Sequence, residues 1–455
     1  MFNLQDILLA TDGNLIRGKN TARIPGVSID SRTLKRGDLF IAIKGKNFDG
    51  HDFIKEVIKK SASAIIVSRR IHFPAAIAIP VILVTDTIKA LGQIARFHRN
   101  RFPIPIVAIT GSAGKTTTKE MVASVLGTEY SVLKNAATEN NNIGVPLTLF
   151  KLNKSHEVAV VELGTNHFGE MRWLSKITNP TVAVFLNIAE SHLEFLESLS
   201  GVFKEKFELV KNMSRDGCVI FNNDDHTLRK IAKKKIKQRL MSFGIETTCH
   251  YRANQICMEP DSTLRFRVNK REIIYLKTPA RHNIYNALAA ISCGRFLNIS
   301  YANIRKALRE FDSLKGRFSL YKIKQVRVID DSYNANPLSL RSAIQTLDNL
   351  KIYGRRILVC ADMLELGRYS RELHRSVGKF VADSQIDSVF TVGKLSRLIS
   401  ETAKRNRYLY ARHYDSVAAA QKGLKQYLRP GDTLLLKGSR AMRMERILAF
   451  LQNST

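Results

Sequence analysis

The stretch PIVAITGSAGKTT, residues 105–117, decides how the central part of this chain folds. An apolar run suited to a buried strand leads into a glycine-containing turn, and a helical segment, TKEMVASVLG (118–127), follows at once. Glycines let a backbone wrap around phosphates, and the N–H groups and dipole of a helix N-terminus attract an anion. The lysine can bring charge to the β- and γ-phosphates, and the following threonine can ligate Mg²⁺. The stretch predicts an ATP site formed by Gly111, Ser112, Ala113, Gly114, Lys115, Thr116 and Thr117.

The spacing of this turn departs from that of the usual phosphate-binding loop. In GxxxxGK[ST] the first glycine would fall at position 109, which is Ile109 here. A tight glycine turn with a purely structural role is the alternative. The succession of strand, TGSAGKTT (110–117) and helix favours ATP binding.

Alternating strand and helix patterns extend on both sides of this stretch. The apolar runs EVAVVEL (157–163) and TVAVFLNI (181–188) follow it, and a second series with VRVIDD (326–331) and RILVCAD (356–362) begins beyond a change in pattern near 314–317. Such alternation is typical of parallel sheets flanked by helices. Before it, shorter β-branched runs end at a proline-containing junction, RFPIP (101–105), which we interpret as a linker.

The length of 455 residues accommodates three domains at ~150 residues each. We therefore expect an α/β protein with a small N-terminal α/β domain (1–101), a central parallel-sheet ATP-binding domain (102–314) and a C-terminal Rossmann-like domain (315–455).

The charge balance is unusual, because 72 Lys and Arg against 40 Asp and Glu give +32. Clustered basic charge is typical of nucleic-acid binding, and basic residues are concentrated at 230–239. They recur almost everywhere else as well, without interleaved aromatic residues. We therefore expect solvated basic faces that attract small anionic substrates, and no nucleic-acid partner.

The remaining composition argues against several classes of protein. No apolar run approaches the ~20 residues needed to span a bilayer, and the segment MFNLQDILLATDG (1–13) lacks the basic start of a signal peptide. Five scattered cysteines without CxxC spacing indicate neither a zinc site nor a disulfide framework. We expect a cytoplasmic protein without membrane insertion.

Two further residues are candidate metal ligands beside Thr116. Glu162 ends one predicted strand and His192 follows the next, at the edge where α/β sheets bind ligands. A lone Glu or His is more often structural, but two at successive strand ends beside a phosphate loop predict Mg²⁺ ligands. Because Mg²⁺ prefers oxygen donors, His192 is the less secure of the two and could act through water.

Longer motifs follow one another as in the Mur ligases, and the chain resembles this family over essentially its whole length. They are TGSAGKTT (110–117), NNNIGVPLTL (140–149), VELGTNHFGE (161–170), NIAESHLE (187–194), ARHNIYNALAA (280–290) and KGRF (315–318). The resemblance implies an ATP-dependent ligase that phosphorylates a substrate carboxylate, after which an amine attacks the acyl phosphate.

The same resemblance implies roles for residues around the phosphates. Arg317 would reach the phosphates from the C-terminal side and, with Lys115 and Mg²⁺, clamp the transferred charge. Asn283 and Asn286 would hold the adenine, although asparagines at these places could also cap turns or helices.

Lys206 lies in GVFKEKFE (201–208), which resembles the segment whose lysine is carbamoylated in this family. A carbamate would turn an ammonium into an oxygen ligand for a second Mg²⁺. Phe207 stands where the family has a small residue, and from sequence alone Lys206 is one more basic surface residue of a lysine-rich helix. Carbamoylation is therefore a hypothesis, and the catalytic set that we predict is Lys115, Glu162, Lys206 and Arg317.

The N-terminal segment SIDSRTLKRGDLFIAIKGKNFDGHDF (28–53) resembles the UDP-binding domain of the later Mur ligases. The resemblance implies that domain 1–101 binds the UDP-muramoyl substrate, although GlyAsp and AspGly pairs also form ordinary turns. The substrate residues expected on this side are Ser31, Arg32, Asp49 and His51, with Asn140 and Asn141 in the central domain.

The C-terminal motif DDSYNANP (330–337) resembles that of the family member that adds D-alanyl-D-alanine to UDP-N-acetylmuramoyl-tripeptide, which yields the pentapeptide precursor of peptidoglycan. By this resemblance Asp331 would contact the ATP ribose or a metal, and Asn334, Asn336 and Asp362 would face the incoming dipeptide. We expect these two substrates, ATP and Mg²⁺ as cofactors, and a monomer.

Three alternatives remain beside this hypothesis. The family member that adds the third amino acid typically carries a TyrAlaHis-type core and a downstream AspAsnProArg-like motif, and neither is found here. The AspGlyHis segment (49–51) argues against a folate-polyglutamating ligase. A phosphate-loop protein that binds nucleic acid is suggested by charge alone and leaves residues 330–337 unexplained.

Overall fold

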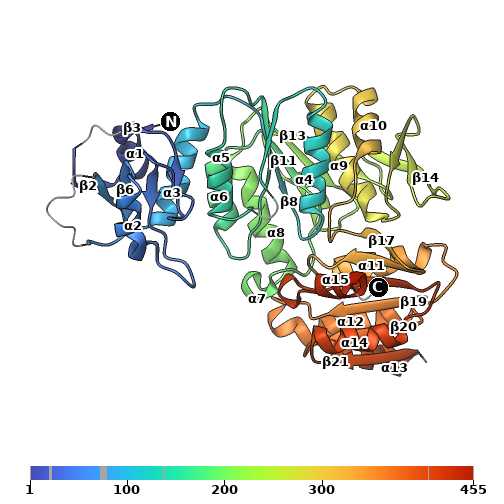
Figure 1. Ribbon diagram of the computed structural model, residues 1–455. Coiled ribbons are helices and arrows are strands. Elements are labelled where there is room, and N and C mark those ends of the chain that lie inside the picture. The colour runs from blue at the N-terminus through green and yellow to red at the C-terminus, as the bar shows by residue number, and fades with distance from the viewer. Residues whose placement is uncertain (1, 20–22, 72–78, 137–138, 408, 454–455) are drawn as a thin grey trace.

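The computed structural model of the protein describes residues 2–19, 23–71, 79–136, 139–407 and 409–453. Three main sheets follow one another along the chain, in the blue, green-to-yellow and orange-to-red parts of Figure 1. The protein is therefore α/β with parallel-sheet domains, as predicted. None of the described helices combines the length and the apolar character that crossing a membrane requires.

The N-terminal sheet has five strands in the order β2-β7-β6-β5-β4, and only its β2–β7 pair is antiparallel. Its parallel strands are short because the β-branched runs seen in the sequence contribute only three or four residues each. The elements of this part are β1 (Phe2–Asn3), α1 (Leu4–Thr11), β2 (Asn14–Arg17), β3 (Arg23–Ile24), β4 (Val27–Ser28), β5 (Leu39–Ile41), η1 (Gly50–Phe53), α2 (Ile54–Lys59), β6 (Ala64–Val67), β7 (Val81–Leu83) and α3 (Thr87–Arg99).

The central sheet has nine strands in the order β16-β15-β14-β13-β12-β11-β8-β10-β9. Its strands are β8 (Ile106–Thr110), β9 (Val132–Lys134), β10 (Val158–Glu162), β11 (Val182–Phe185), β12 (Cys218–Asn222), β13 (Arg239–Gly244), β14 (Tyr251–Met258), β15 (Leu264–Val268) and β16 (Glu272–Leu276). Its helices are α4 (Lys115–Leu126), α5 (Gly144–Leu149), α6 (Glu170–Thr178), α7 (Leu193–Leu196), α8 (Leu199–Phe207), α9 (His282–Phe296) and α10 (Tyr301–Glu310), with η2 (Glu208–Asn212) and η3 (Leu228–Lys233).

Both faces of the parallel part of this sheet are covered by helices. Along β8, Ile106 and Ala108 pack toward α3, α5, α6 and α8, whereas Val107 and Ile109 pack toward α4, α9 and α10. Successive side chains of a strand point to opposite faces, so a strand covered on both sides is apolar throughout. The continuous apolar run 105–110 therefore predicted this position correctly.

The antiparallel pairs β14–β15 and β15–β16 extend the sheet at one edge and were not predicted. In β15 the buried residues alternate with partly exposed arginines, so one face is solvated. Such half-buried strands carry shorter and more polar runs than the fully buried ones, so no continuous apolar run marks them in the sequence.

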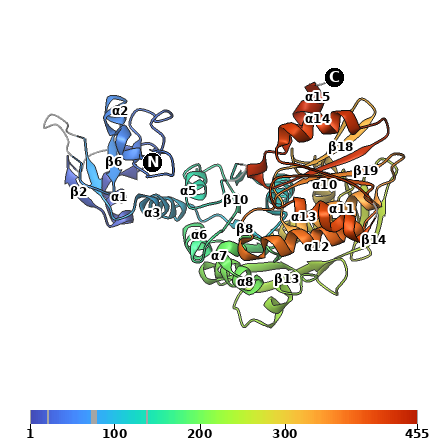
Figure 2. The ribbon, with the colours of Figure 1, turned by 90° about the horizontal axis from the view of Figure 1, so that it is seen from below.

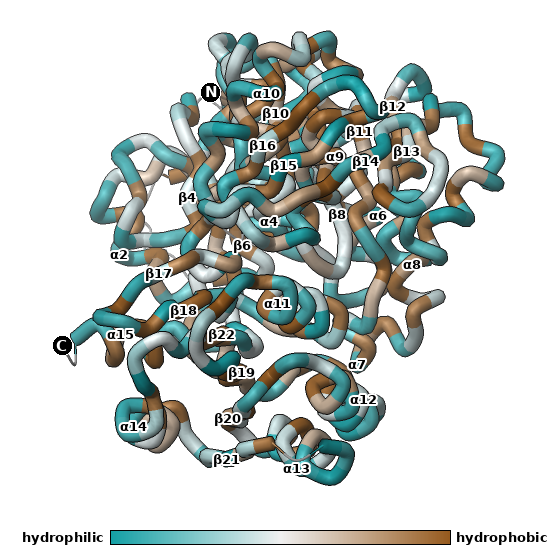
Figure 3. Tube along the Cα trace, turned by 90° about the vertical axis from the view of Figure 1, so that its right-hand side faces the viewer, coloured by the Kyte–Doolittle hydropathy of each residue, from teal (hydrophilic) through white to brown (hydrophobic). Residues whose placement is uncertain are grey.

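The C-terminal sheet has the order β17-β18-β22-β19-β20-β21, with only β17 antiparallel to its neighbour. Helices α11–α13 pack on one face and α14–α15 on the other, and Figure 3 shows hydrophobic stretches in the strands between them. Its elements are β17 (Ser319–Ile323), β18 (Val326–Asp331), α11 (Pro337–Asn349), β19 (Arg356–Ala361), η4 (Gly367–Tyr369), α12 (Ser370–Ala382), β20 (Ser388–Val392), α13 (Arg397–Asn406), β21 (Tyr410–Tyr414), α14 (Val417–Tyr427), β22 (Thr433–Lys437), η5 (Arg440–Met442) and α15 (Glu445–Asn453).

The junction at 101–105 differs from the simple linker that the sequence suggested. Helix α3 belongs by sequence to the N-terminal part, yet it packs on α5 and α6 and shares one apolar core with both sheets. Figure 2 shows α3 leading from the N-terminal part to the central one. The buried Arg99 then fastens the junction, since its guanidinium donates to the carbonyls of Phe102, Ile104 and Thr178, the last two at 3.0 Å.

Replacing Arg99 by Met is expected to destabilise this junction. The change leaves three carbonyls without their charged donor and should lower the free energy of unfolding by about 3 kcal/mol. Denaturant unfolding followed through Trp173, the only tryptophan and a neighbour of Gly92 on α3, would report the loss.

The matched control is Arg96→Met, one turn earlier on α3, where the side chain is exposed. Its effect should stay within about 0.5 kcal/mol. Equal unfolding midpoints for the two variants would contradict the role given to Arg99.

Candidate active site

The phosphate-binding turn after β8 is held in shape by a residue that follows the neighbouring strand β11. Helix α4 begins at Lys115 directly after Gly114, whose φ of 81° lies in the left-handed region that favours glycine. The side chain of Asn187 clamps the turn, because its Oδ1 accepts from the Ala113 N–H at 2.8 Å and its Nδ2 donates to the Ala113 carbonyl at 3.1 Å. Asn187 lies in the quoted motif 187–194, but no role was predicted for it.

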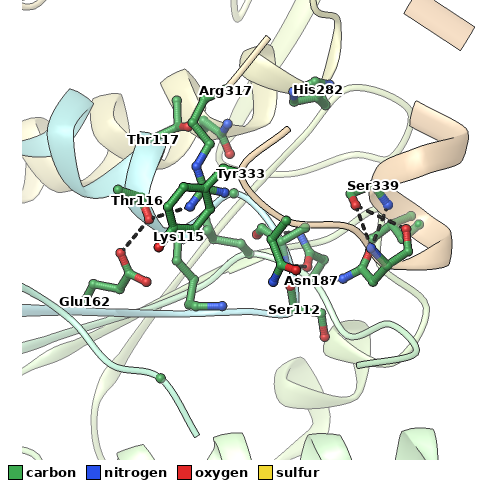
Figure 4. A pocket seen from close by; sticks show the side chains of 18 of the residues that line it. Ser112, Lys115, Thr116, Thr117, Glu162, Asn187, His282, Arg317, Tyr333 and Ser339 are labelled. Carbon is green, nitrogen blue, oxygen red and sulfur yellow. Dashed lines mark hydrogen bonds between the residues drawn. The ribbon is translucent and has the colours of Figure 1, made fainter. Parts of the chain in front are cut away.

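The turn opens into a cavity of about 780 Å³ between the central and C-terminal domains, and Figure 4 shows side chains from both around it. Of the seven residues predicted to form the ATP-binding turn (111–117), all except Gly111 line this cavity. The other predicted residues that line it are Asn140, Asn141, Glu162, His192, Asn283, Asn286, Arg317, Asp331, Asn334 and Asn336.

A chain of hydrogen bonds joins the residues predicted to handle metal and phosphate. The Thr116 hydroxyl donates to Glu162 Oε2 at 2.8 Å, and Asn140 Nδ2 donates to Glu162 Oε1 at 2.7 Å. Arg317 Nη2 donates to the Thr116 oxygen at 3.2 Å, so the C-terminal domain reaches the phosphate turn directly (Figure 4). The backbone of Glu162 is fixed in turn by Asn135, a buried residue that the sequence analysis missed.

Two lysines of the central domain bring positive charge to this region: the half-buried Lys115 lines the cavity, and the buried Lys206 lies outside its lining. Lys115 donates from Nζ to the Gly111 carbonyl at 2.9 Å, and burial lowers its pKa, with Arg317 adding to the decrease while Glu162 opposes it. Lys206 on α8 is 1 % exposed, so its interpretation as a surface lysine is wrong. Burial, and then the charge of Lys115, lowers the pKa of Lys206 to about 7. Within the described part of the chain, no hydrogen bond from its ammonium is found.

The helix that carries Lys206 is placed by its neighbour Glu205. The buried Glu205 carboxylate accepts from the Thr165 hydroxyl at 3.1 Å, from the Gly169 N–H at 2.8 Å and from the Met171 N–H at 2.7 Å. These bonds fix the position of α8 and therefore of Lys206. The positive charge of Lys115 is, after burial, the second-largest cause of the lowered pKa of Lys206.

The C-terminal domain contributes three cationic groups and an aromatic ring. The guanidinium of Arg317 lies 3.9 Å from the centre of the Tyr333 ring, and Arg440 lies 5.4 Å from it. Lys437 Nζ pairs with Asp331 at 2.5 Å and donates to the Asn334 carbonyl at 3.1 Å. Tyr333 lies within the quoted motif 330–337, but no role was predicted for Tyr333, Lys437 or Arg440.

The two predicted adenine residues bind each other at the start of α9. Asn286 Nδ2 donates to Asn283 Oδ1 at 2.8 Å, while Asn286 Oδ1 accepts from Thr118 at 3.1 Å. Asn283 Nδ2 also donates to Thr278 at 3.3 Å. They thus fasten α9 to α4 while lining the cavity. Beside them, the buried Nδ1 of His282 has no hydrogen-bond partner among the residues that the structure describes.

Asn141 and Asn336 share a capping role at the rim of the cavity. Asn141 Oδ1 accepts from the N–H groups of Ile143 and Gly144 at the start of α5. Asn336 caps α11 by accepting from the Ser339 N–H at 2.8 Å, and it donates to the Ser112 carbonyl at 3.2 Å across the domain interface.

Asp362 does not line the cavity, so its predicted contact with the dipeptide is not supported. Its buried carboxylate accepts from the N–H groups of Lys394, Leu395 and Ser396 at 2.7–3.0 Å. Three backbone donors already occupy the group, which therefore fixes the turn after β20.

The four N-terminal candidates also lie away from the cavity, but they share one sheet edge. They follow the carboxyl ends of the neighbouring parallel strands β4 and β5. His51 Nδ1 bonds Asp49 at 2.6 Å and its Nε2 accepts from the Ser68 N–H at 3.1 Å, after β6. Ser31 donates to Glu56 at 3.2 Å, and the exposed Arg32 pairs with Asp30 at 2.7 Å. This edge is where α/β sheets bind ligands.

The donor set at the cavity fits a magnesium nucleotide. Gly114 has a φ of 81°, and a Cβ there would lie 2.7 Å from Asn286 Oδ1, so this conformation of the turn requires glycine. Thr116 and Glu162 supply the oxygen donors that Mg²⁺ prefers. In the described ranges no three or more His, Cys, Asp or Glu residues gather as a preformed metal site, so phosphate and water oxygens would complete the coordination.

Three family models match successive parts of the chain. They are "Mur ligase family, catalytic domain" over residues 23–99, "Mur ligase middle domain" over 109–294 and "Mur ligase, glutamate ligase domain" over 316–440. Among curated relatives, the UDP-N-acetylmuramoyl-tripeptide–D-alanyl-D-alanine ligases of Bacillus subtilis (strain 168) and of Escherichia coli (strain K12) are each 35 % identical over 95 % of this chain and 94 % of their own length.

Solved structures agree with these relatives. MurF from Acinetobacter baumannii is similar with a TM-score of 0.90 at 31 % identity, covering 99 % of each chain. MurF ligase from Thermotoga maritima in complex with ADP is similar with a TM-score of 0.83 at 29 % identity, covering 94 % of this chain and 97 % of that one. The UDP-N-acetylmuramoyl-L-alanyl-D-glutamate–2,6-diaminopimelate ligase shares the fold, with a TM-score of 0.57 at 14 % identity.

Gly114→Ala is expected to weaken nucleotide binding. The backbone conformation costs a residue with a Cβ about 1–2 kcal/mol, and the Cβ also meets Asn286. The dissociation constant for ADP, measured by calorimetry, should rise by about 10-fold or more. Gly431→Ala is the control, since Gly431 has a φ of 92° but no atom closer than 3.8 Å. Equal ADP affinities in the two variants would contradict the fit of the turn to phosphate.

Proposed function

The chain belongs to the Mur ligase family, and from this premise we propose that it joins D-alanyl-D-alanine to UDP-N-acetylmuramoyl-tripeptide at the expense of ATP. The product is the pentapeptide precursor of peptidoglycan. The observation that supports the proposal most is the link from Arg317 through Thr116 to Glu162, because it joins a phosphate-binding turn, a carboxylate and a cation from another domain in one cavity.

The chemistry requires two successive transfers. The γ-phosphoryl group of ATP passes to the tripeptide carboxylate, which gives an acyl phosphate and ADP. The amine of the dipeptide then attacks the acyl carbon, the amide bond forms, and inorganic phosphate leaves with the carbon–oxygen bonding pair. Lys115 and Arg317 are placed to stabilise the negative charge that spreads over the transferred group.

Magnesium belongs to the same proposal. Thr116 and Glu162 are the residues that would hold it, with His192 and a carbamoylated Lys206 as further donors. The ion would neutralise phosphate charge and polarise the phosphoryl oxygens. The arrangement of Thr116 and Glu162 at 2.8 Å supports this assignment.

The three sheets suggest how the substrates are divided. We assign residues 1–101 to binding of the UDP-muramoyl group, 102–314 to ATP and 315–455 to the incoming dipeptide, with ATP between the last two. The sheet edge with Asp49 and His51 supports the first assignment, since both side chains are already ordered there. Asn334 and Asn336 at the cavity rim are the residues proposed for the dipeptide. Since the reaction consumes ATP, a cytoplasmic location is part of the proposal.

The direct test is phosphate release from ATP and Mg²⁺ with UDP-muramoyl-tripeptide as acceptor. Turnover is expected with D-alanyl-D-alanine, and mass spectrometry should show the pentapeptide. A parallel reaction holds UDP-muramoyl-dipeptide with L-lysine or diaminopimelate.

Turnover only in the parallel reaction would move the chain to the neighbouring step of the family. If neither reaction released phosphate and nucleic acid stayed bound to the protein in moderate salt, the alternative of a nucleic-acid-binding protein, suggested by the charge of +32, would be favoured.

The lowered pKa of Lys206, about 7, supports the hypothesis that its amine is carbamoylated. Above pH 7 the amine is mostly neutral and can attack CO₂, whereas below pH 7 it is protonated and cannot. Protein equilibrated with ¹³C-bicarbonate should therefore show a carbamate signal that is stronger at pH 8 than at pH 6.

The signal should disappear in Lys206→Ala and persist in Lys204→Ala, because Lys204 is exposed on the same helix. Ligase activity should fall about 10–100-fold in Lys206→Ala only, the range for loss of support to a bound metal. Full ligase activity of the Lys206→Ala variant would contradict the carbamoylation hypothesis.

A further inference from the structure

The C-terminal segment 365–367 contacts the central domain beside the cavity. The Glu194 N–H, in α7, donates to the Glu365 carbonyl at 3.3 Å. A Cβ at Gly367, at the start of η4, would lie 2.9 Å from the Glu194 Cα, so the two backbones approach as closely as glycine allows. Figure 1 shows α7 at this boundary, against the orange part of the chain.

A hydrogen-bonded side-chain pair crosses the same boundary. His192 Nδ1 lies 2.6 Å from Glu365 Oε2, and a carboxylate can only accept, so Nδ1 carries the proton. The His192 ring lines the cavity, with 23 % of its side chain exposed. Its other nitrogen, Nε2, has no hydrogen bond recorded to any described residue.

The backbone at both ends of this pair is strained. His192 has a φ of 53° and Glu365 a φ of 62°, and the left-handed region costs residues other than glycine about 1–2 kcal/mol each. Surroundings must hold such residues in place, and they are enriched at functional sites. The surrounding structure therefore holds both residues of the pair, one in each domain, in an unfavourable backbone conformation.

We propose that Glu365 is a positioning residue that fixes the proton of His192 on Nδ1 and thereby presents Nε2 to the magnesium site, directly or through a water ligand. A second hydrogen bond of this kind sets the tautomer and orientation of a metal-binding histidine and raises its basicity. Because Glu365 belongs to the C-terminal domain, this orientation of the His192 ring depends on the docking of that domain. The inference rests on the proposed function, since it assumes a magnesium nucleotide in the cavity.

Three variants test the role of Glu365. Glu365→Ala removes the acceptor, Glu365→Gln keeps an acceptor oxygen without the charge, and Glu194→Gln removes a neighbouring exposed charge that does not contact His192. Selective ¹⁵N labelling of the 11 histidines, with His192→Asn for assignment, should show the Nδ1–H form of His192 in the wild type and in Glu194→Gln. Glu365→Ala should shift the ring toward the Nε2–H form.

Metal affinity provides the second measurement. Mn²⁺, a paramagnetic probe that accepts the same donors, is titrated in the presence of ADP and followed by electron paramagnetic resonance. Its dissociation constant should rise about 10-fold in Glu365→Ala, the lower end of the effect of such partners. Glu365→Gln should lie between Glu365→Ala and the wild type, and Glu194→Gln should match the wild type.

An unchanged His192 tautomer or an unchanged Mn²⁺ affinity in Glu365→Ala would overturn the inference. Neither measurement needs the peptide substrates, so the inference survives if another amine proves to be the acceptor in the ligase assay. Failure of the wild-type protein to bind Mn²⁺ with ADP would overturn both the inference and the magnesium site on which it rests. ADP binding without metal, measured for each variant, confirms that the fold is retained.

Discussion

The hydrogen bond from the Thr116 hydroxyl to the buried Glu162 carboxylate is the contact on which the rest of the site depends. It exists because β8 and β10 are adjacent and parallel, with Ile109 opposite Glu162 in register. The turn after β8 and the last residue of β10 must then meet at the same edge of the sheet. On the other side of β8, β11 places Asn187 against Ala113 in the same way. Three strand ends thus hold one loop, and the loop can stay open toward phosphate without collapsing.

The C-terminal domain uses this fixed edge as its docking surface. Arg317 reaches Thr116 and Asn336 reaches the Ser112 carbonyl, both at the turn after β8, and Glu365 reaches His192 after β11. Polar contacts and a large cavity make up much of this boundary, with Tyr369 and Leu373 adding apolar contacts, whereas α3 joins the other two sheets through one continuous apolar core. Apolar packing resists separation in water, whereas polar contacts can be exchanged for contacts with substrate and solvent. The boundary that opens onto the cavity is therefore the one suited to opening during a reaction cycle.

The sequence predicted the parallel architecture and most residues of the cavity for one physical reason. Fully buried strands are apolar throughout, and loops at their carboxyl ends carry the polar residues, so the run 105–110 and the positions of Glu162 and His192 could be located without coordinates. The solvated strand β15 and the linking role of α3 depend on partners distant in sequence, and no local pattern marks them. The burial of Lys206, which excludes its alternative interpretation as a surface residue, also depends on distant partners, because Glu205 beside it is bonded to residues 165–171. Asp362 shows the opposite error, since a motif carboxylate was given to a ligand when three backbone N–H groups already bind it.

Three cationic side chains, Lys115, Lys206 and Arg317, lie close together at or beside the cavity. Burial lowers the pKa of Lys115, Lys206 and Arg317, and the charge of Lys115 lowers that of Lys206 further, so these groups disfavour one another in the free protein. The carboxylates nearby offset this only in part: Glu162 acts on Lys115 and Arg317, Asp331 on Arg317, and Glu205 on Lys206. The polyphosphate of ATP and a carbamate on Lys206 would each remove part of the excess positive charge. Binding of substrate then relieves a repulsion that the fold maintains, and the free energy released becomes available for holding the C-terminal domain in place. Repulsion between Lys115 and Lys206 thus costs stability in the free protein and favours the docked, substrate-bound state.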